Sequence, residues 1–261
     1  MGPGAPKLYQ AGLRVGYAVL GMLVLGAIWV LIARTVQSAL VPTPAEAFET
    51  IYVNFFDIEA LRYIYYSSSG LVENLWYTIQ NVLTSVALGS VAGALFGTML
   101  ARSRFLKLIA EPPLLVMGMF PVIMLLPFFT MWFGTNRIAL YGLVLFYTFV
   151  TVALVARTAT ENVSGYFEDY ASSLGASRRF FQTYVVLPAI VPEVIGGIRI
   201  SLAAGWGFET VAEILGAPLG AGRLIQVFSV AVMTADIFGV LICMGVIAVI
   251  ADAIVAAIGR W

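Results

Sequence analysis

The sequence contains no histidine and almost no cysteine: its 261 residues include no His and one Cys, Cys243. Without His, the chain cannot form a Cys2His2 zinc finger, a His-ligated haem site, a Cys-His nucleophile or a Ser-His-Asp triad. A single Cys excludes a disulfide within the chain. We therefore expect no metal and no cofactor.

Charge is also scarce, because only 11% of the residues are Asp, Glu, Lys or Arg, against about 25% in an average soluble domain. The 14 basic and 14 acidic residues cancel, and no basic cluster indicates nucleic acid as a partner. No glycine-rich loop ends in Gly-Lys-Ser or Gly-Lys-Thr, so the sequence predicts no P-loop for a nucleotide. Energy for any active process would have to come from a partner or an ion gradient.

Apolar residues are abundant instead, at 61% of the chain with a mean hydropathy of +0.96. One soluble core could not bury that much apolar surface. About 20 apolar residues cross a bilayer as a helix, and windows with little or no charge therefore mark the expected spans. The sequence predicts an all-α membrane protein with one transmembrane domain over 1–261 and six transmembrane helices. The six windows are 15–33, 74–101, 112–136, 138–156, 190–212 and 237–258.

The orientation is predicted from the Lys and Arg residues between the spans, which accumulate on the cytoplasmic side. With both termini inside, nine basic residues lie on the inner side and four on the outer side. The inner residues are Lys7, Arg14, Arg102, Arg104, Lys107, Arg157, Arg178, Arg179 and Arg260, and the outer ones are Arg34, Arg62, Arg137 and Arg223. The count favours an N-in and C-in topology, and an even number of helices agrees with it because it places both termini on the same side.

A long polar loop over 157–189 follows the fourth span, and it is longer than a turn between two helices needs. Ser164 can cap a first short helix that Gly175 ends, and Ser177 can cap a second that ends before Pro188. Two short helices with exposed aromatic residues suit docking into a groove of a partner. A surface-lying or re-entrant amphipathic loop is the alternative.

The spacing of residues in this loop resembles the EAA motif of binding-protein-dependent ABC transporter permeases. That motif reads Glu-Ala-Ala, three residues, Gly, nine residues, Ile, any residue, Leu-Pro. This chain has Asp169-Tyr170-Ala171, then Gly175, then Val185 and Leu187-Pro188 at the same spacing. Ala171, Gly175, Leu187 and Pro188 are identical to the motif, whereas Asp169, Tyr170 and Val185 replace Glu, Ala and Ile.

Further segments resemble the nitrate, sulfonate and taurine branch of these permeases. They are Pro121, Pro127, Trp132-Phe133-Gly134, Leu187-Pro188-Ala189, Pro192-Glu193, Gly197-Ile198-Arg199, Gly205-Trp206 and Ala212-Glu213. The resemblance implies a type I ABC importer permease in the bacterial inner membrane whose loop forms coupling helices. It implies as partners two cytoplasmic ATPase subunits, an extracytoplasmic substrate-binding protein and a second permease copy, with no ATP hydrolysis by this chain.

Two groups of residues within the spans are candidates for the translocation pathway. Met119, Phe120 and Pro121 lie in the third span, where Pro121 and Pro127 should bend the helix. Trp206 and Glu209 lie in the fifth, and a carboxyl inside a membrane is a functional hypothesis by default. The alternatives are purely structural: the Met-rich stretch fills space between helices with adaptable side chains, and Glu209 is a buried, paired carboxyl.

Small residues recur at helical spacing in two spans. Gly89, Gly93 and Gly97 share one face of the second span, and Gly197, Ser201 and Gly205 repeat the pattern in the fifth. Such faces allow close helix contact in lipid, either within one subunit or between two.

The leading hypothesis is therefore the membrane subunit of an ATP-driven importer for a small polar organic or oxyanion solute, of the sulfonate, taurine, nitrate or heterocyclic-precursor type. A secondary transporter or channel using Glu209 or Asp236 as an ion site is the alternative. That alternative leaves the spacing of the 157–189 loop without an explanation.

Overall fold

The computed structural model describes residues 7–36, 40–65, 69–134, 136–163 and 165–259, and within these ranges every regular element is a helix. Five helices are long and apolar enough to cross a membrane, and a bent pair raises the number to six. The five are α1 (Lys7–Thr35), α4 (Leu71–Arg102), α7 (Arg137–Asn162), α10 (Leu187–Ile214) and α12 (Thr234–Ile258). The prediction of an all-helical membrane protein is confirmed, and each expected window corresponds to one of these helices or to the bent pair.

The bent pair replaces the expected third span. It consists of α5 (Arg104–Met119), the 3₁₀ turn η1 (Val122–Leu125) and α6 (Leu126–Phe133), with a bend of 98°. Pro121 lies at the break with extended backbone and is the N-cap residue that precedes η1. Pro127 was expected to bend the helix too, but it occupies the first turn of α6. A proline is tolerated there because the first-turn N–H groups have no partner within the helix.

The central packing is between α4 and α7, which cross with their backbones in close contact. A Cβ atom on Gly89 would lie 2.8 Å from Cβ of Thr148, and one on Gly93 would lie 2.6 Å from the carbonyl oxygen of Phe149. A Cβ on Gly97 would overlap the carbonyl oxygen of Ala153. The glycine face of α4 therefore packs within one subunit, which decides between the two roles considered for it.

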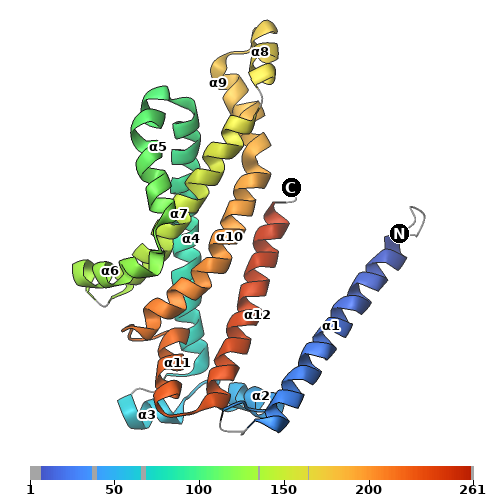
Figure 1. Cartoon of the computed structure of the whole chain (residues 1–261), viewed down its shortest axis with the longest axis vertical. Helices are drawn as coiled ribbons and strands as arrows, with labels where there is room; N and C mark the ends of the chain where they lie inside the picture. The colour runs from blue at the N-terminus through green and yellow to red at the C-terminus, as the bar shows by residue number, and fades with distance from the viewer. Residues whose placement is uncertain (1–6, 37–39, 66–68, 135, 164, 260–261) are drawn as a thin grey trace.

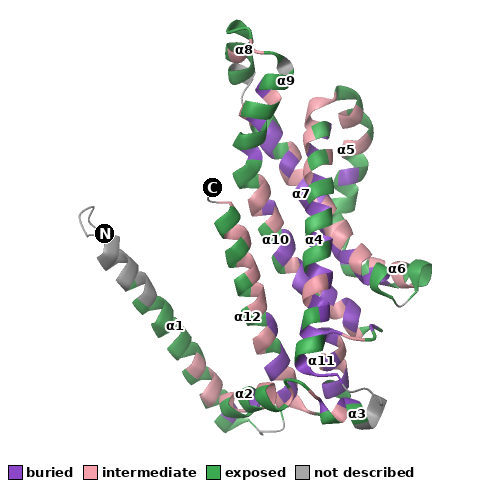
Figure 2. Cartoon of the chain, turned by 180° about the vertical axis from the view of Figure 1, so that it is seen from behind, coloured by how far each residue is buried: buried purple, intermediate pink, exposed green. Residues whose placement is uncertain are grey.

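Helix α10 packs against both α7 and α4, and its own small residues face them. A Cβ on Gly197 would lie 3.1 Å from Cγ2 of Val155, and one on Gly205 would lie 3.2 Å from Cγ1 of Val144. The buried residues in Figure 2 accordingly concentrate along α4, α7 and the facing side of α10.

Three short helices collect at one end of the bundle and were not expected from the sequence. They are α2 (Pro44–Val53), α3 (Glu59–Tyr65) and α11 (Ala221–Val230). A capping box starts α2, because the Thr43 side chain accepts from the Glu46 backbone N–H and the Glu46 carboxylate accepts from that of Thr43. The opposite end carries the α4–α5 turn and two further short helices, α8 (Gly165–Ser173) and α9 (Arg178–Phe181) (Figure 1).

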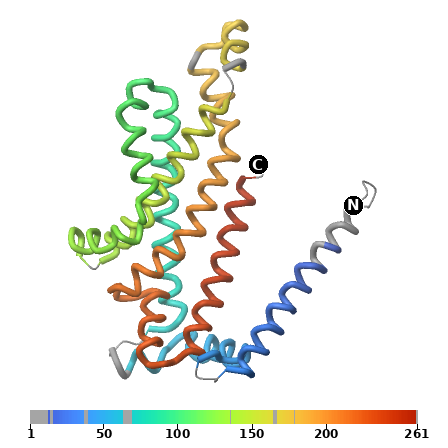
Figure 3. Tube along the Cα trace, in the orientation of Figure 1, coloured from blue at the N-terminus to red at the C-terminus, as the bar shows by residue number. Residues whose placement is uncertain are grey.

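Among the described residues, helix α1 contacts the rest of the chain near its C-terminal end. Trp29 donates from Nε1 to the carbonyl oxygen of Pro42 at 3.0 Å, and its ring stacks on Phe238 with 5.7 Å between centroids. Away from that contact, α1 diverges from α12, as the trace in Figure 3 shows. Only 6% of its spanning window is buried within this chain.

Candidate functional site

The segment expected to dock onto a partner contains a helix, a glycine turn and a second helix. Helix α8 ends in a Schellman motif, in which the N–H of Ala176 donates to the carbonyl of Ala171 and that of Gly175 to the carbonyl of Ser172. Gly175 has φ +80°, a left-handed conformation that glycine adopts without strain. The predicted end of this helix at Gly175 is confirmed. Ser164, the predicted N-cap of the same helix, lies outside the described residues.

The second short helix begins as predicted but does not end at Pro188. Ser177 caps α9, because its Oγ accepts from the backbone N–H of Phe180 at 3.2 Å. Helical turns then continue through a π-helical turn, η2 (Gln182–Val186), directly into α10. The wider i→i+5 turn, closed by Leu187 N–H to the carbonyl of Gln182, places Pro188 in the first turn of α10. The predicted end before Pro188 is wrong for that reason.

The surface of this segment is apolar and hollowed. A cavity of about 630 Å³ lies between α8 and α9. Leu174 beside it is 70% exposed, Tyr170 58% and Phe180 53%. The cavity is lined by Phe167, Tyr170, Ala171, Leu174, Gly175, Ala176, Ser177, Phe180, Phe181 and Val185.

One residue of the motif, Ala171, joins this surface to the bundle. Ala171 packs against the buried cluster of Ala159, Phe181, Val186 and Ile190. Asp169 is exposed on α8, and Leu187 and Pro188 are exposed where η2 meets α10. The structure thus brings Tyr170, Ala171 and Gly175 together at one cavity, while Asp169, Leu187 and Pro188 flank it.

At the other end of α10, Glu213 is fully buried and joins three helices. Thr78 on α4 donates from Oγ1 to Glu213 Oε1 at 2.8 Å, and the backbone N–H of Gly222 donates to Oε2 at 2.9 Å. The N–H of Ala221 donates to Thr78 Oγ1 at 2.9 Å. Glu213 and Thr78 therefore supply acceptors for the first N–H groups of α11, which have no partners within their own helix.

Glu209 lies one turn before Glu213 on α10, and it is also fully buried. The Asn81 amide on α4 donates from Nδ2 to Glu209 Oε1 at 2.6 Å, while Glu209 Oε2 has no hydrogen-bond partner among the described residues. In this conformation the carboxyl lies inside the bundle, away from solvent.

The candidate pathway residues fall into two separate places. Met119, Phe120 and Pro121 meet at the α5–α6 bend, where Met119 is 82% and Phe120 50% exposed. Next to them lies an apolar cavity of about 500 Å³ whose walls include Phe120 and Trp132. Trp206, by contrast, is packed in the core on α10, beside Glu209. The structure does not join the two groups into one site.

Three other ionisable side chains within the spans, Arg199, Asp252 and Asp236, have hydrogen-bond partners. Arg199 on α10 donates from Nε and Nη2 to both carboxylate oxygens of Asp252 on α12, each at 2.7 Å. Asp236 accepts from the Asn54 amide at 2.5 Å. In the part of the chain that the structure describes, no three His, Cys, Asp or Glu side chains gather as metal ligands would.

The arrangement of the spans matches the membrane-spanning subunits of ABC importers. A chain of the inward-facing MetNI methionine ABC transporter superimposes with a TM-score of 0.65 at 19% identity, covering 78% of this chain and 98% of that chain. A chain of a bacterial ABC transporter that imports the polysaccharide alginate gives 0.61 at 15% identity, covering 98% and 99%. At these identities the likeness establishes the fold alone.

Sequence comparison establishes the family. The model of the binding-protein-dependent transport system inner membrane component matches residues 85–261, and the chain belongs to that family. The protein is accordingly a multi-pass inner-membrane component and a transport subunit rather than an enzyme, as the sequence predicted.

Individual relatives carry names from the branch that the sequence resembles. The taurine transport permease TauC of Escherichia coli is 31% identical over 156 residues, 58% of this chain and 57% of TauC. The aliphatic sulfonates permease SsuC of Bacillus subtilis, a putative assignment, is 26% identical over 236 residues, 90% and 82%. The formylaminopyrimidine permease ThiX of Halalkalibacterium halodurans is 25% identical over 201 residues, 77% and 76%.

Proposed function

We propose that this chain is the permease subunit of an ATP-driven importer and that α8 and α9 dock onto a separate cytoplasmic ATPase. The observation that carries the proposal is the apolar cavity between α8 and α9, whose exposed Tyr170, Leu174 and Phe180 extend from the bundle on a turn closed by Gly175. Exposed aromatic and aliphatic side chains around a hollow are typical of a protein–protein contact.

The cargo is proposed from the relatives' names and from the scarcity of charge. Taurine, aliphatic sulfonates and formylaminopyrimidine are small polar organic solutes, and this chain resembles permeases named for each. An extracytoplasmic binding protein delivers the solute in this proposal. Two copies of this chain form the pathway between them, and two ATPase subunits bind them on the cytoplasmic side.

Within that assembly, the α5–α6 bend is the proposed pathway wall. Met119, Phe120 and Pro121 are the side chains that this bend exposes. Trp206 and Glu209 are buried within the bundle, apart from the bend, in the present conformation. They reach the pathway if α10 separates from α4 during transport, which breaks the Asn81–Glu209 hydrogen bond.

The docking surface is tested by co-purification of the ATPase with affinity-tagged permease. Leu174→Ala removes an exposed side chain of the α8–α9 cavity, and we expect it to weaken ATPase retention about tenfold, since a central interface residue contributes more than about 1 kcal/mol. Leu108→Ala on α5 is the matched control, because Leu108 is 71% exposed and Leu174 70%. Equal retention by the two variants would show that α8 and α9 are not the docking surface.

Transport is tested in proteoliposomes that contain the permease, its ATPase and its binding protein. We expect uptake of a sulfonate or a heterocyclic precursor that needs ATP and the binding protein. Uptake driven by an ion gradient without ATP would instead establish the secondary transporter. Glu209→Gln should change uptake or specificity if the carboxyl reaches the pathway, and unchanged values would remove Glu209 from it.

A further inference from the structure

A second hollow at the α8–α9 end of the molecule has polar walls of one charge sign. This cavity of about 530 Å³ lies between the α4–α5 turn and the start of the long helix formed by α9, η2 and α10. The turn contributes Met99, Arg102, Ser103 and Leu106, and the long helix contributes Arg179 and Gln182. Two guanidinium groups from separate elements therefore line one hollow.

The hydrogen-bonding groups of the cavity suit a phosphate. Arginine recognises phosphate oxygens through paired N–H groups. The Ser103 hydroxyl oxygen accepts from the backbone N–H of Leu106 at 3.3 Å, so its own O–H is directed elsewhere as a donor. The side-chain amide of Gln182 adds N–H donors.

The surroundings keep this region positively charged. The basic residues of the turn, the adjoining end of α7 and α9 are Arg102, Arg104, Lys107, Arg157, Arg178 and Arg179. Glu111 and Glu161 pair with two of them: Lys107 with Glu161 at 2.6 Å, and Arg157 with Glu111 at 2.6 Å and Glu161 at 3.1 Å. Helix α8, which carries Glu168 and Asp169, lies beyond α9 (Figure 1). An anion is thus favoured over a cation.

Apolar side chains continue from the cavity along the outside of α4 and α5. Met99 lines the cavity itself and is 57% exposed, and Leu95 one turn further along α4 is 61% exposed. On α5, Phe105 and Leu108 are each 71% exposed. A polar hollow that opens onto an exposed apolar helix surface matches a lipid, with its headgroup in the hollow and its acyl chains along the helices.

We propose that this cavity binds the phosphate of an anionic phospholipid from the cytoplasmic leaflet, held by Arg102 and Arg179. The bound lipid joins the α4–α5 turn to the helix that carries the docking segment, and it restricts movement of one relative to the other. The cytoplasmic assignment rests on the orientation in the proposed function, whereas the existence of the site does not depend on the ATPase.

The test measures lipid binding by the full chain alone, purified in detergent, without ATPase or ATP. Native mass spectrometry compares phosphatidylglycerol with phosphatidylcholine of the same acyl chains, and we expect phosphatidylglycerol to be retained in preference. Arg102→Gln and Arg179→Gln should each weaken that retention about fivefold, the usual contribution of one basic side chain near an anionic lipid.

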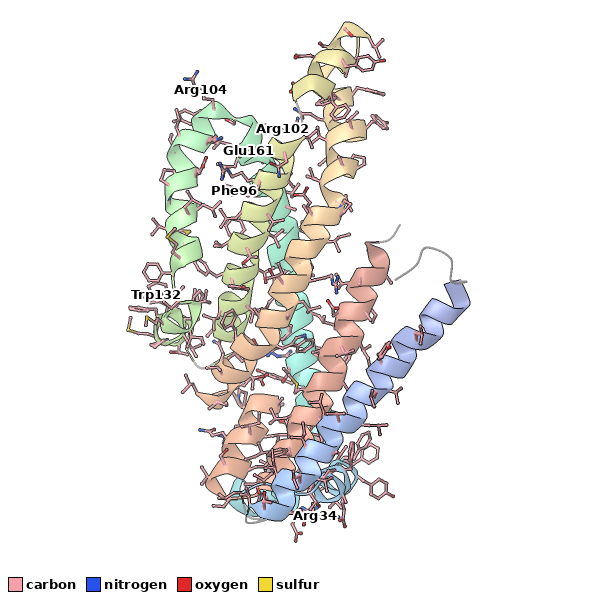
Figure 4. All side chains as sticks on the ribbon, turned by 45° about the vertical axis from the view of Figure 1, so that its right-hand side comes forward. Arg34, Phe96, Arg102, Arg104, Trp132 and Glu161 are labelled. Carbon is pink, nitrogen blue, oxygen red and sulfur yellow. The ribbon has the colours of Figure 1, made fainter. Side chains whose placement is uncertain are left out.

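Arg104→Gln is the matched control, because it removes the same charge from the same turn outside the cavity. Figure 4 shows Arg104 pointing away from the molecule, while Arg102 lies on the side of the turn that faces α7. Equal losses for Arg102→Gln and Arg104→Gln would mean diffuse surface attraction and overturn the site. Arg179 is exposed, so its variant should keep the melting temperature of the parent and serves if Arg102→Gln fails to fold.

Two further arms separate the lipid from other sources of the same chemistry. Inorganic phosphate at millimolar concentration should not displace phosphatidylglycerol, and full displacement would assign the site to a free anion. Phosphatidylglycerol should also remain bound after the ATPase is added. Its release by the ATPase would make the cavity part of the protein interface and would overturn the proposal.

Discussion

At the scale of single residues, Thr78 makes two contacts that no other described side chain duplicates. Its hydroxyl donates to Glu213 and accepts from the N–H of Ala221. Thr78→Val keeps the shape and removes both bonds, so we expect about 2 kcal/mol of lost stability. That corresponds to a melting temperature about 4–8 °C lower, measured by tryptophan fluorescence in detergent.

Thr98→Val is the control for that change, because it makes the same replacement in the same helix. The Thr98 hydroxyl donates only to carbonyl groups of its own helix, with 2.8 Å to that of Ala94. We expect little change from it. A melting temperature lowered equally by both variants would contradict the assigned role of Thr78.

The ion pair between Arg199 and Asp252 predicts the order of the melting temperatures of three variants, not the size of each change. An unpaired charge inside a membrane is costly, whereas two apolar side chains in its place are not. We therefore expect Arg199→Leu and Asp252→Leu each to lower the melting temperature more than the double variant does. A double variant with the lowest melting temperature of the three would show that the pair stabilises the fold in itself.

The sequence predicted which charged residues needed a role but not which partners they would find. Glu209 is notable in the sequence because a carboxyl within a span is rare. Its partner Asn81 is 128 residues away, and the partner of Glu213, Thr78, is 135 residues away. Neither spacing contains a local signal, because the pairing follows from how α4 packs on α10.

At the scale of elements, the contact between α4 and α7 depends on the absence of a side chain at Gly97. A Cβ there would overlap the backbone carbonyl of Ala153, which cannot move without shifting α7. Gly97→Ala should lower stability by about 1–3 kcal/mol, measured by thermal unfolding in detergent.

Gly245→Ala on α12 is the control for Gly97→Ala, because a Cβ at Gly245 meets no atom within 4 Å. There alanine should be neutral or raise the melting temperature slightly, since glycine lowers helix stability by about 0.5–1 kcal/mol. Similar losses at both positions would mean that close approach at Gly97 is not what α4 and α7 require.

The helices differ in how well the sequence predicts them. The spans were predictable because charge-free windows of sufficient length have few alternatives to a membrane helix. Helix α2 was missed although Thr43, Pro44 and Glu46 form a readable capping pattern. The path through Pro188 was not predictable, because continuation through a π-turn depends on packing against neighbouring helices.

At the scale of the whole molecule, the predicted N-in and C-in orientation can be tested by labelling. In a Cys243→Ala background, Glu49→Cys marks the α2 end and Ser172→Cys the α8 end, and both positions are exposed. A membrane-impermeant maleimide added to intact cells should label Glu49→Cys alone, because the basic residues accumulate at the α8 end. Labelling of Ser172→Cys alone would reverse the orientation.

The continuity of α9, η2 and α10 has a mechanical consequence. The helix from Arg179 to Ile214 has 36 residues and is therefore roughly 54 Å long. One end carries the proposed docking surface, and the other carries Glu213, whose carboxylate accepts from the backbone N–H of Gly222 in α11. A helix resists compression along its axis, so in the proposed assembly a displacement of the α9 end would move Glu213, an acceptor of α11, at the other end of the bundle. The helix from Arg179 to Ile214 therefore connects the proposed docking surface continuously with the α11 end of the bundle.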